Sequence, residues 1–263
     1  MQNFLLVPNG ELVVFGDPKQ NVYQRPLDAN GDIRLGIIGG QWNRQLTTSR
    51  RFTNPRLANL ATAFQTQFMA NLPTDDIVAE NTISNTFNFQ IVTYIDLRQN
   101  NSIESIITNI INIISNDNNE ARDFAVLASS TKLLRNIDIL YRQRTNEQTE
   151  ITFISNETLE RLKQIHQVTD EKAANWKFNR DFEALERTRK QLFTTDKRCL
   201  KISTIQSFKG WESPSVIVIL HNTTSRPMSP QTIYTAITRA RENMYIINIG
   251  NDTYHNFFYN QTL

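Results

Sequence analysis

The chain has 263 residues, of which 39% are hydrophobic and 10% aromatic, enough to build a sizeable core as one large domain or two small ones. Its 28 basic and 26 acidic residues leave a formal net charge of +2, so charge alone does not predict a nucleic-acid partner, although a local basic face stays compatible with one. These numbers indicate a globular protein.

Cysteine, histidine and hydropathy patterns exclude several classes of protein. The single cysteine, Cys199, cannot form an internal disulfide, and the three histidines lack the spacing of a zinc site, so we expect no metal centre on this chain. No apolar run is long enough to cross a membrane, and the first ten residues lack the basic start and long apolar region of a secretion signal. We therefore expect a cytoplasmic protein with no membrane partner.

The first predicted strand leads into a polar loop. Residues 11–15 (ELVVF) form a short apolar run between glycine-containing turns, which predicts a buried strand. The loop GDPKQNVY then places Gln20 and Tyr23 just past the strand end, where open α/β sheets bind ligands. An ordinary polar turn with a tyrosine beside it explains the same residues, so both interpretations stay open.

A helix is predicted from Pro55, because Thr53 or Asn54 can cap it with the proline in its first turn. Its apolar residues share one helical stripe: Leu57, Leu60, Ala61, Phe64 and Phe68. Arg50 and Arg51 come just before this helix. They are either a solvated pair or fixed donors to a phosphate.

The middle of the chain alternates between strand and helix patterns. Strands are predicted at 89–95, 124–128 and 150–154, and helices at 101–115, 131–142 and 156–166. This alternation predicts an α/β layer with a mainly parallel sheet. The segment 177–201 is dense in both signs of charge and predicts an amphipathic surface helix, with apolar residues at helical spacing: Phe178, Phe182, Leu185 and Leu192.

The last third of the chain carries the densest polar motif. Strands are predicted at 200–204 and 215–220, on either side of the loop TIQSFKGWE, whose hydroxyls, amide, lysine, glycine and glutamate are typical of a loop that handles phosphates. A helix is predicted from Ser229-Pro230 through IYTAITRARE, with Arg239 on a different side from its apolar residues. A strand at 244–249 and a helix at 252–259 follow.

Four sequence blocks carry a family resemblance. GDPKQNVY, LTTSRRFTNPRLANLATAF, ISTIQSFKGWESPSVIVI and YTAITRARENMYII occur in the order, and at roughly the separations, of the later motifs of superfamily 1 helicases of the UvrD/Rep/PcrA type. The chain resembles this family over nearly its whole length, most closely in SFKGWE and YTAITRAR. The resemblance implies a RecA-like α/β fold with a mainly parallel sheet flanked by helices. It makes 1–40 a C-terminal remnant of the first RecA-like domain and 41–263 the second.

The resemblance also implies roles for individual residues in the use of ATP with Mg²⁺. Gln20 would read the γ-phosphate or the attacking water, and Arg51 and Arg239 would act as arginine fingers. Arg50, Gly210 and Glu212 would contact the nucleotide, with Glu212 at the sugar. The residues implied in nucleic-acid binding are Tyr23, Thr204, Gln206, Ser207 and Lys209.

The chain departs from the family pattern at three places. Arg50 stands where the family often has a tyrosine that stacks on adenine, and it offers a planar guanidinium instead. Gln24-Arg25-Pro26 replaces a stretch that contains a tryptophan in UvrD-type proteins. Gln206 replaces a histidine, which keeps a hydrogen-bond donor but removes a titratable ring.

The largest departure is the lack of a phosphate cradle. No G-x-x-x-x-G-K-[ST] sequence and no acidic DExx pair after a strand occur in the 263 residues, so the Walker A and Walker B elements and the Mg²⁺ ligands are absent from them. We therefore expect half an active site, inactive alone, whose partners are the missing N-terminal RecA-like domain and single-stranded or duplex DNA, with RNA not excluded. The stretch between Arg51 and Thr204 leaves little room for a large inserted accessory domain.

Two functions fit these expectations. The first is the C-terminal part of an ATP-dependent superfamily 1 DNA helicase or translocase. The alternative is a non-catalytic RecA-like module that binds nucleic acid or a partner helicase. Another P-loop enzyme, such as a nucleotide kinase, is disfavoured because it needs the same missing cradle.

Overall fold

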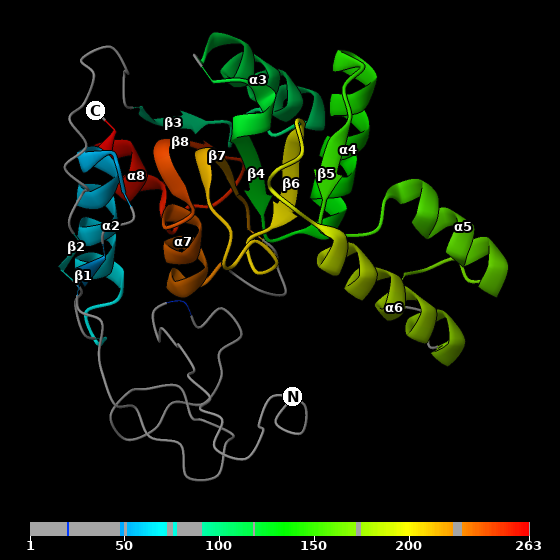
Figure 1. Cartoon of the computed structure of the whole chain (residues 1–263). Coiled ribbons are helices and arrows are strands. Elements are labelled where there is room, and N and C mark those ends of the chain that lie inside the picture. The colour runs from blue at the N-terminus through cyan, green and yellow to red at the C-terminus, as the bar shows by residue number, and fades with distance from the viewer. Residues whose placement is uncertain are drawn as a thin grey trace, which may run out of the picture.

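A parallel sheet lies at the centre of the molecule (Figure 1). The computed structural model describes residues 20, 48–49, 52–72, 76–77, 91–117, 119–171, 175–222 and 228–262. Six of the described strands pair side by side, all in parallel, in the order β3-β8-β7-β4-β6-β5. These strands are β3 (Val92–Asp96), β4 (Phe124–Ala128), β5 (Thr149–Ile151), β6 (Leu200–Thr204), β7 (Ser213–Leu220) and β8 (Ala240–Asn248). Two-residue strands β1 (Thr48–Ser49) and β2 (Asp76–Ile77) pair separately.

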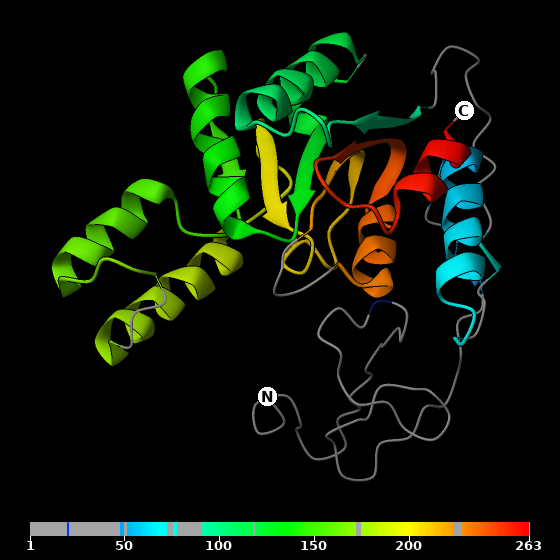
Figure 2. The same ribbon diagram turned by 180° about the vertical axis from the view of Figure 1, so that it is seen from behind.

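Helices cover both faces of the sheet, as the two opposite views show (Figures 1 and 2). Helices α2 (Pro55–Phe68), α7 (Pro230–Ile237) and α8 (His255–Gln261) pack on one face, and α3 (Ile103–Asn116) and α4 (Thr131–Thr145) pack on the other. A short 3₁₀ helix, η2 (Ala121–Asp123), precedes β4. The predicted α/β class, with a parallel sheet flanked by helices, is confirmed.

The side chains of β4 show why the helices form two layers. Ala125 and Leu127 enter the core under α2 and α7, whereas Phe124 and Val126 enter the core under α3 and α4. All four are fully buried, because successive strand residues point to opposite faces and both faces are covered. The continuous apolar run FAVLA therefore reflects a central strand, and its predicted bounds agree with the structure.

Helix α2 begins as its sequence predicts. The side-chain Oδ1 of Asn54 accepts a hydrogen bond from the backbone N–H of Arg56 at 2.8 Å, so Asn54 is the N-cap, and Pro55 occupies the first helical position. The predicted apolar stripe faces the core, with Phe68 partly buried at its end. The predicted strand at 11–15 lies outside the described residues.

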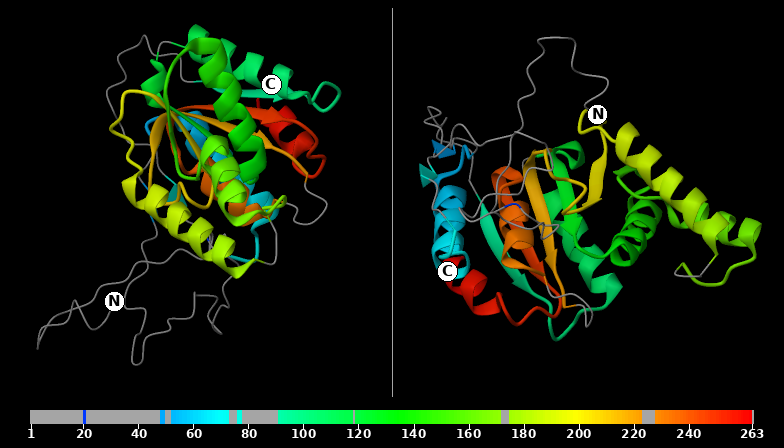
Figure 3. Two further views of the ribbon diagram at one scale, coloured as in Figure 1. Left: turned by 90° about the vertical axis from the view of Figure 1, so that its right-hand side faces the viewer. Right: turned by 90° about the horizontal axis from the view of Figure 1, so that it is seen from below.

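Two helices stand apart from the sheet. Helices α5 (Asn156–His166) and α6 (Trp176–Leu192) lie side by side and project beyond the β5 edge (Figure 3). Their small shared core contains Leu159, Leu162 and Phe178, with Phe182 partly buried. The predicted surface helix is confirmed as far as Leu192, where α6 ends, and not over the rest of the segment 177–201. Leu192 does not join the core, because 65% of its surface is exposed.

The helix predicted from Ser229-Pro230 is shorter than expected. Ser229 caps α7, but the helix ends at Ile237, and β8 begins at Ala240. The prediction that the helix continues through Ala240, with the strand beginning at 244, was therefore wrong, although Ala240 does face the core. Ala240 is instead paired with Ser213 of β7, and this sheet contact replaces the helical hydrogen bonds after Ile237.

Within the part of the chain that the structure describes, no helix combines the length and apolar character needed to cross a lipid bilayer.

Candidate functional site

The loop between β6 and β7 is held by hydrogen bonds within the loop and by one buried ring. The N–H of Phe208 donates to the carbonyl oxygen of Thr204 at 3.0 Å, and the N–H of Ser207 donates to the Thr204 hydroxyl oxygen at 3.1 Å. Phe208 is fully buried and anchors the loop to the core. Gly210 has φ +97°, a backbone conformation that glycine adopts at low cost, so a side chain there would strain the turn.

Arg239 is almost completely buried, with 2% of its surface exposed, in the turn between α7 and β8. Its Nε donates to the carbonyl oxygen of Thr235 at 3.1 Å, and its Nη1 donates to the carbonyl oxygen of Trp211 at 3.1 Å. Its Nη2 donates to the hydroxyl oxygen of Thr238 at 3.0 Å. The prediction that Arg239 lies away from the apolar side of a helix missed this burial, which these acceptors make tolerable.

Gln20 completes this environment from the distant N-terminal part of the chain. Its side-chain Oε1 accepts a hydrogen bond from Arg239 Nη2 at 3.2 Å. Its backbone carbonyl oxygen accepts one from Lys209 Nζ at 3.1 Å. The structure thus brings together three predicted site residues from three sequence blocks, and two of them are cations directed at the third.

The start of α2 is tied to the strand that follows Arg239. The backbone N–H and the hydroxyl of Thr53 both donate to the carbonyl oxygen of Arg241, at 3.1 and 2.9 Å. The side-chain amide of Asn54 donates to the carbonyl oxygen of Glu242 at 2.6 Å. The block that contains the paired arginines is therefore joined to the block that contains Arg239. Arg50, Arg51 and Tyr23 themselves lie outside the described residues.

The remaining predicted contacts lie along the β6–β7 loop. Lys209 and Gly210 are exposed, and four residues are half-buried: Thr204, Gln206, Ser207 and Glu212. Side chains of the loop therefore reach the surface, whereas Arg239 is buried beneath the loop. The arrangement offers positive charge, amide and hydroxyl groups on a rigid support, which suits recognition of phosphate groups.

Sequence reasoning missed three groups that hold Arg239. Trp211 and Thr235 contribute only their backbone carbonyl oxygens, so their side-chain types gave no signal. Thr238 does contribute its side chain, and its place next to Arg239 in the TRA block was the one local signal that could have found it.

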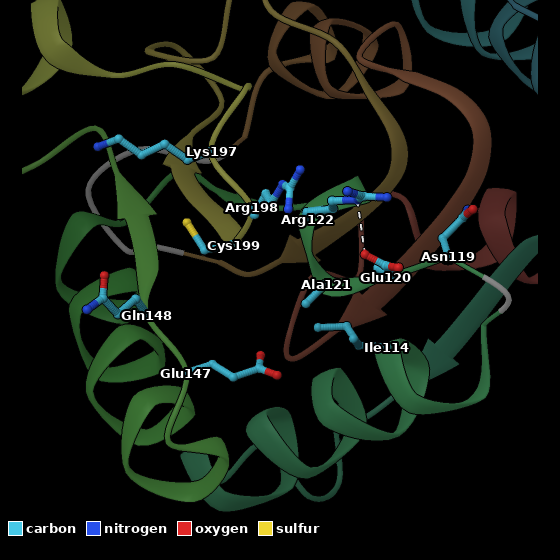
Figure 4. Close-up of a pocket in the computed structure, with 10 residues that line it drawn as sticks. All are labelled: Ile114, Asn119, Glu120, Ala121, Arg122, Glu147, Gln148, Lys197, Arg198 and Cys199. Atoms are coloured by element: carbon cyan, nitrogen blue, oxygen red, sulfur yellow. Dashed lines mark ion pairs between the residues drawn. The ribbon is translucent and has the colours of Figure 1, made fainter.

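A separate hollow lies at the start of strands β4, β5 and β6 (Figure 4). Its lining includes Arg122, Arg198, Glu147 and Cys199, and burial raises the pKa of the Cys199 thiol. Among the residues that the structure describes, none of those predicted for the site lines this hollow. The described ranges also contain no group of three or more histidine, cysteine, aspartate or glutamate side chains arranged to hold a metal ion.

The parallel sheet with helices packed on both faces is a RecA-like α/β fold. Residues 200–247, from β6 through the loop, β7 and α7 into β8, match the family of UvrD-like helicase C-terminal domains. Over this segment the chain is therefore similar to UvrD-like helicase C-terminal domains, and the resemblance predicted from the motifs is confirmed at this level.

One solved structure that aligns with the chain is described as the C-terminal domain of a possible DNA helicase from Lactobacillus plantarum WCFS1. The alignment covers 77% of this chain and 89% of that one, with a TM-score of 0.44 and 13% sequence identity. No curated protein matches the chain.

Proposed function

We propose that this chain is the C-terminal part of an ATP-dependent DNA helicase or translocase of superfamily 1, in which 1–40 completes a first RecA-like domain and 41–263 forms the second. The observation that carries the proposal is the convergence of Arg239 and Lys209 on Gln20, at 3.2 and 3.1 Å. Gln20 and Arg239, whose family counterparts serve one nucleotide site, meet across 219 positions of sequence, and Lys209 of the β6–β7 loop joins them by its hydrogen bond to the Gln20 backbone.

The chemistry of Arg239 supports a role as an arginine finger. Its hydrogen bonds to Thr235, Trp211 and Gln20 fix the direction of the guanidinium group. A phosphate oxygen that replaced the amide oxygen of Gln20 would form a charge-assisted hydrogen bond, which is stronger than the neutral one. Because the position is preorganised, the charge acts without rearrangement at the moment of reaction.

The second arginine finger in this proposal is Arg51. Its support is indirect: Thr53, two residues later, is hydrogen-bonded to the backbone of Arg241, two residues after Arg239. The same strand therefore anchors both sequence blocks. Arg50 is proposed to face the adenine ring and Glu212 the sugar, with the Gly210 turn between Glu212 and the nucleic-acid contacts.

The nucleic-acid side of the proposal rests on the β6–β7 loop. Its half-buried and exposed polar residues, from Thr204 to Lys209, offer hydroxyl, amide and ammonium groups to a phosphodiester backbone, the contacts that supply most affinity for DNA. Lys209 belongs to this loop and also donates a hydrogen bond to the backbone of Gln20, so it links the nucleic-acid side of the proposal to the nucleotide side. Tyr23 is proposed to stack on a base, worth about 1–3 kcal/mol.

ATP with Mg²⁺, when bound, would supply the phosphoryl group that is hydrolysed. The loop that cradles the ATP phosphates is proposed to lie on the first RecA-like domain. The Walker A and Walker B elements do not occur in these 263 residues. Gln20, Lys209 and Arg239 fit such a ligand as hydrogen-bond donors and positive charges beside its phosphates, because the two cations already share one polar neighbour. We expect no hydrolysis by this chain alone.

The test is a pair of arginine substitutions in an enzyme completed with the upstream RecA-like domain. Arg239→Ala should lower the ATP hydrolysis rate by roughly a thousandfold or more, the usual loss on removing an arginine finger. Arg241→Ala is the matched control, because its side chain is exposed and only its backbone oxygen makes the contact with Thr53. Equal rates for the Arg239→Ala and Arg241→Ala enzymes would refute the proposed role.

The alternative, a non-catalytic module that binds nucleic acid or a partner helicase, makes a different prediction. The completed enzyme would then bind single-stranded DNA but show no hydrolysis above the upstream domain alone, and Arg239→Ala would change neither property. Measuring fluorescent single-stranded DNA binding beside hydrolysis therefore separates the two functions.

A further inference from the structure

The acceptor of Arg239 Nη1 is held in place by an aromatic contact on the opposite side of the loop. That acceptor is the carbonyl oxygen of Trp211, 3.1 Å away. The Trp211 indole packs edge-on against the ring of Phe193, with centroids 5.6 Å apart and an interplanar angle of 77°. Phe193 immediately follows the last residue of α6 and is its C-cap.

We propose that Trp211 is a positioning residue for Arg239 and that, through Phe193, it ties the orientation of this arginine to the C-terminal end of α6. The proposal deepens the function proposed above by naming what holds the arginine, and the arginine's role in hydrolysis rests on that function. The geometric link itself does not depend on it.

The backbone of Trp211 is constrained from two directions. Its N–H donates to the carbonyl oxygen of Phe208 at 3.0 Å, on the loop side. The Phe208 ring in turn packs edge-on against Phe193 at 6.0 Å, so the three aromatic residues are joined to one another. Phe193 is 4% exposed and Phe208 is fully buried, which makes them a firm support. The half-buried indole of Trp211, through its contact with Phe193, supplies the side-chain contact that fixes the orientation of the Trp211 carbonyl group.

The interaction energy of this aromatic contact is large enough to orient the Trp211 carbonyl group but too small to decide whether the domain folds. An edge-to-face aromatic pair adds a modest stabilisation beyond the burial of its area. Losing that amount leaves a domain with this core folded, because its sheet is covered on both faces. It is nevertheless enough to let the Trp211 carbonyl oxygen leave its position for part of the time.

The link to α6 follows from where this helix makes its contacts. From Glu183 to Leu192 all residues except the half-buried Glu186 are exposed, and Phe193 is the first buried residue after them. Phe193 is thus the point where the end of α6 meets the core under the β6–β7 loop. Displacement of this end of α6 is therefore expected to displace the acceptor of Arg239 as well.

The link can be tested in this chain by nuclear magnetic resonance of the Arg239 side chain, with Arg239→Lys used to assign its signals. Buried guanidinium hydrogens bound to fixed acceptors exchange slowly with water. Trp211→Ala and Phe193→Ala should each accelerate exchange of the Arg239 Nη hydrogens by up to about tenfold, which corresponds to about 1.4 kcal/mol. Trp211→Phe retains an aromatic ring and should restore most of the protection.

Phe124→Leu is the control, because Phe124 is a fully buried aromatic residue in the core under α3 and α4, on the opposite face of the sheet. Unchanged Arg239 exchange in folded Trp211→Ala and Phe193→Ala proteins overturns the proposal, and so does an equal acceleration by Phe124→Leu. If either alanine variant fails to fold, Trp211→Leu and Phe193→Leu give the same comparison with less loss of volume.

A second measurement separates this proposal from the proposed function. In the completed enzyme Trp211→Ala should lower kcat for ATP hydrolysis and leave KM for ATP nearly unchanged, and Trp211→Phe should recover kcat. Altered Arg239 exchange with unaltered hydrolysis would leave the positioning link intact and contradict the arginine-finger role instead.

Discussion

The surroundings of Arg239 and the outer half of helix α6 use the same kinds of charged residue in opposite ways. Arg239 is buried, and its hydrogen bonds run to groups that lie far apart in the sequence, such as Gln20 and Trp211. On α6, Arg187 pairs with Glu183 one helical turn away, and both side chains are largely exposed. One arginine is part of a three-dimensional arrangement, and the other belongs only to its own helix.

The difference shows where a charge can carry function. A buried arginine loses hydration and is tolerated only when several acceptors replace the lost water, so its position is fixed. An exposed ion pair on a helix is worth at most about 0.5 kcal/mol and leaves both side chains free to move. We therefore expect substitutions around Arg239 to have large effects and those on outer α6 small ones.

The largest loss of stability should come from the aromatic support of the loop. Phe208→Ala should lower the free energy of unfolding by about 3–5 kcal/mol, because a fully buried ring leaves a cavity. Denaturant titration followed by circular dichroism measures this loss. Leu192→Ala, at a site that is 65% exposed, is the control and should change stability by less than about 0.5 kcal/mol. Similar losses for both variants would contradict the contrast.

The next effect should come from the cap that joins α2 to β8. Asn54→Ala removes both the hydrogen bond to the N–H of Arg56 and the one to the carbonyl oxygen of Glu242. Loss of an N-cap alone costs about 0.5–2 kcal/mol, and the lost link to β8 should place this variant at the upper end. Asn54→Ser can restore the cap but is too short for the link, so thermal unfolding should place it between wild type and alanine.

The core beneath α2 should also respond to high pH. Burial raises the pKa of Tyr254 to about 12, and its hydroxyl donates to the carbonyl oxygen of Met228 at 2.9 Å. The unfolded chain releases this proton near pH 10, so the stabilisation is complete below pH 10 and is lost as the pH rises toward 12. Denaturant titrations at pH 9 and 11 should show weaker folding at pH 11. Tyr254→Phe should reduce that difference, and an unchanged difference would assign it to other groups.

The smallest effect should come from the surface of α6. Arg187→Ala removes the ion pair with Glu183, at 3.0 Å between two exposed side chains, and should change the free energy of unfolding by less than about 0.5 kcal/mol. The double variant with Glu183→Ala completes a thermodynamic cycle. A coupling energy above about 1 kcal/mol would show that α6 is more firmly organised than its exposure indicates.

Local patterns in the sequence determined much of the fold. The bounds of β4 and α5, and the caps Asn54 and Ser229, agree with the structure because each depends on residues within a few positions of one another. The alternation of strands and helices likewise predicted the parallel α/β fold, and the order of motif blocks predicted the likeness to UvrD-like helicase C-terminal domains that residues 200–247 show. These features are encoded locally or in motif order.

Only the tertiary structure decided how Arg239 is held. The helix that its block predicts stops at Ile237, because Ala240 pairs with Ser213 of a neighbouring strand, and that contact depends on the register of the sheet. Two of the acceptors of Arg239 come from distant parts of the chain: Gln20, 219 residues away, and the backbone of Trp211, which carries no side-chain signal. Backbone carbonyls are common to all residues, so the direction in which each one points is set by the folded chain and cannot be read from residue types.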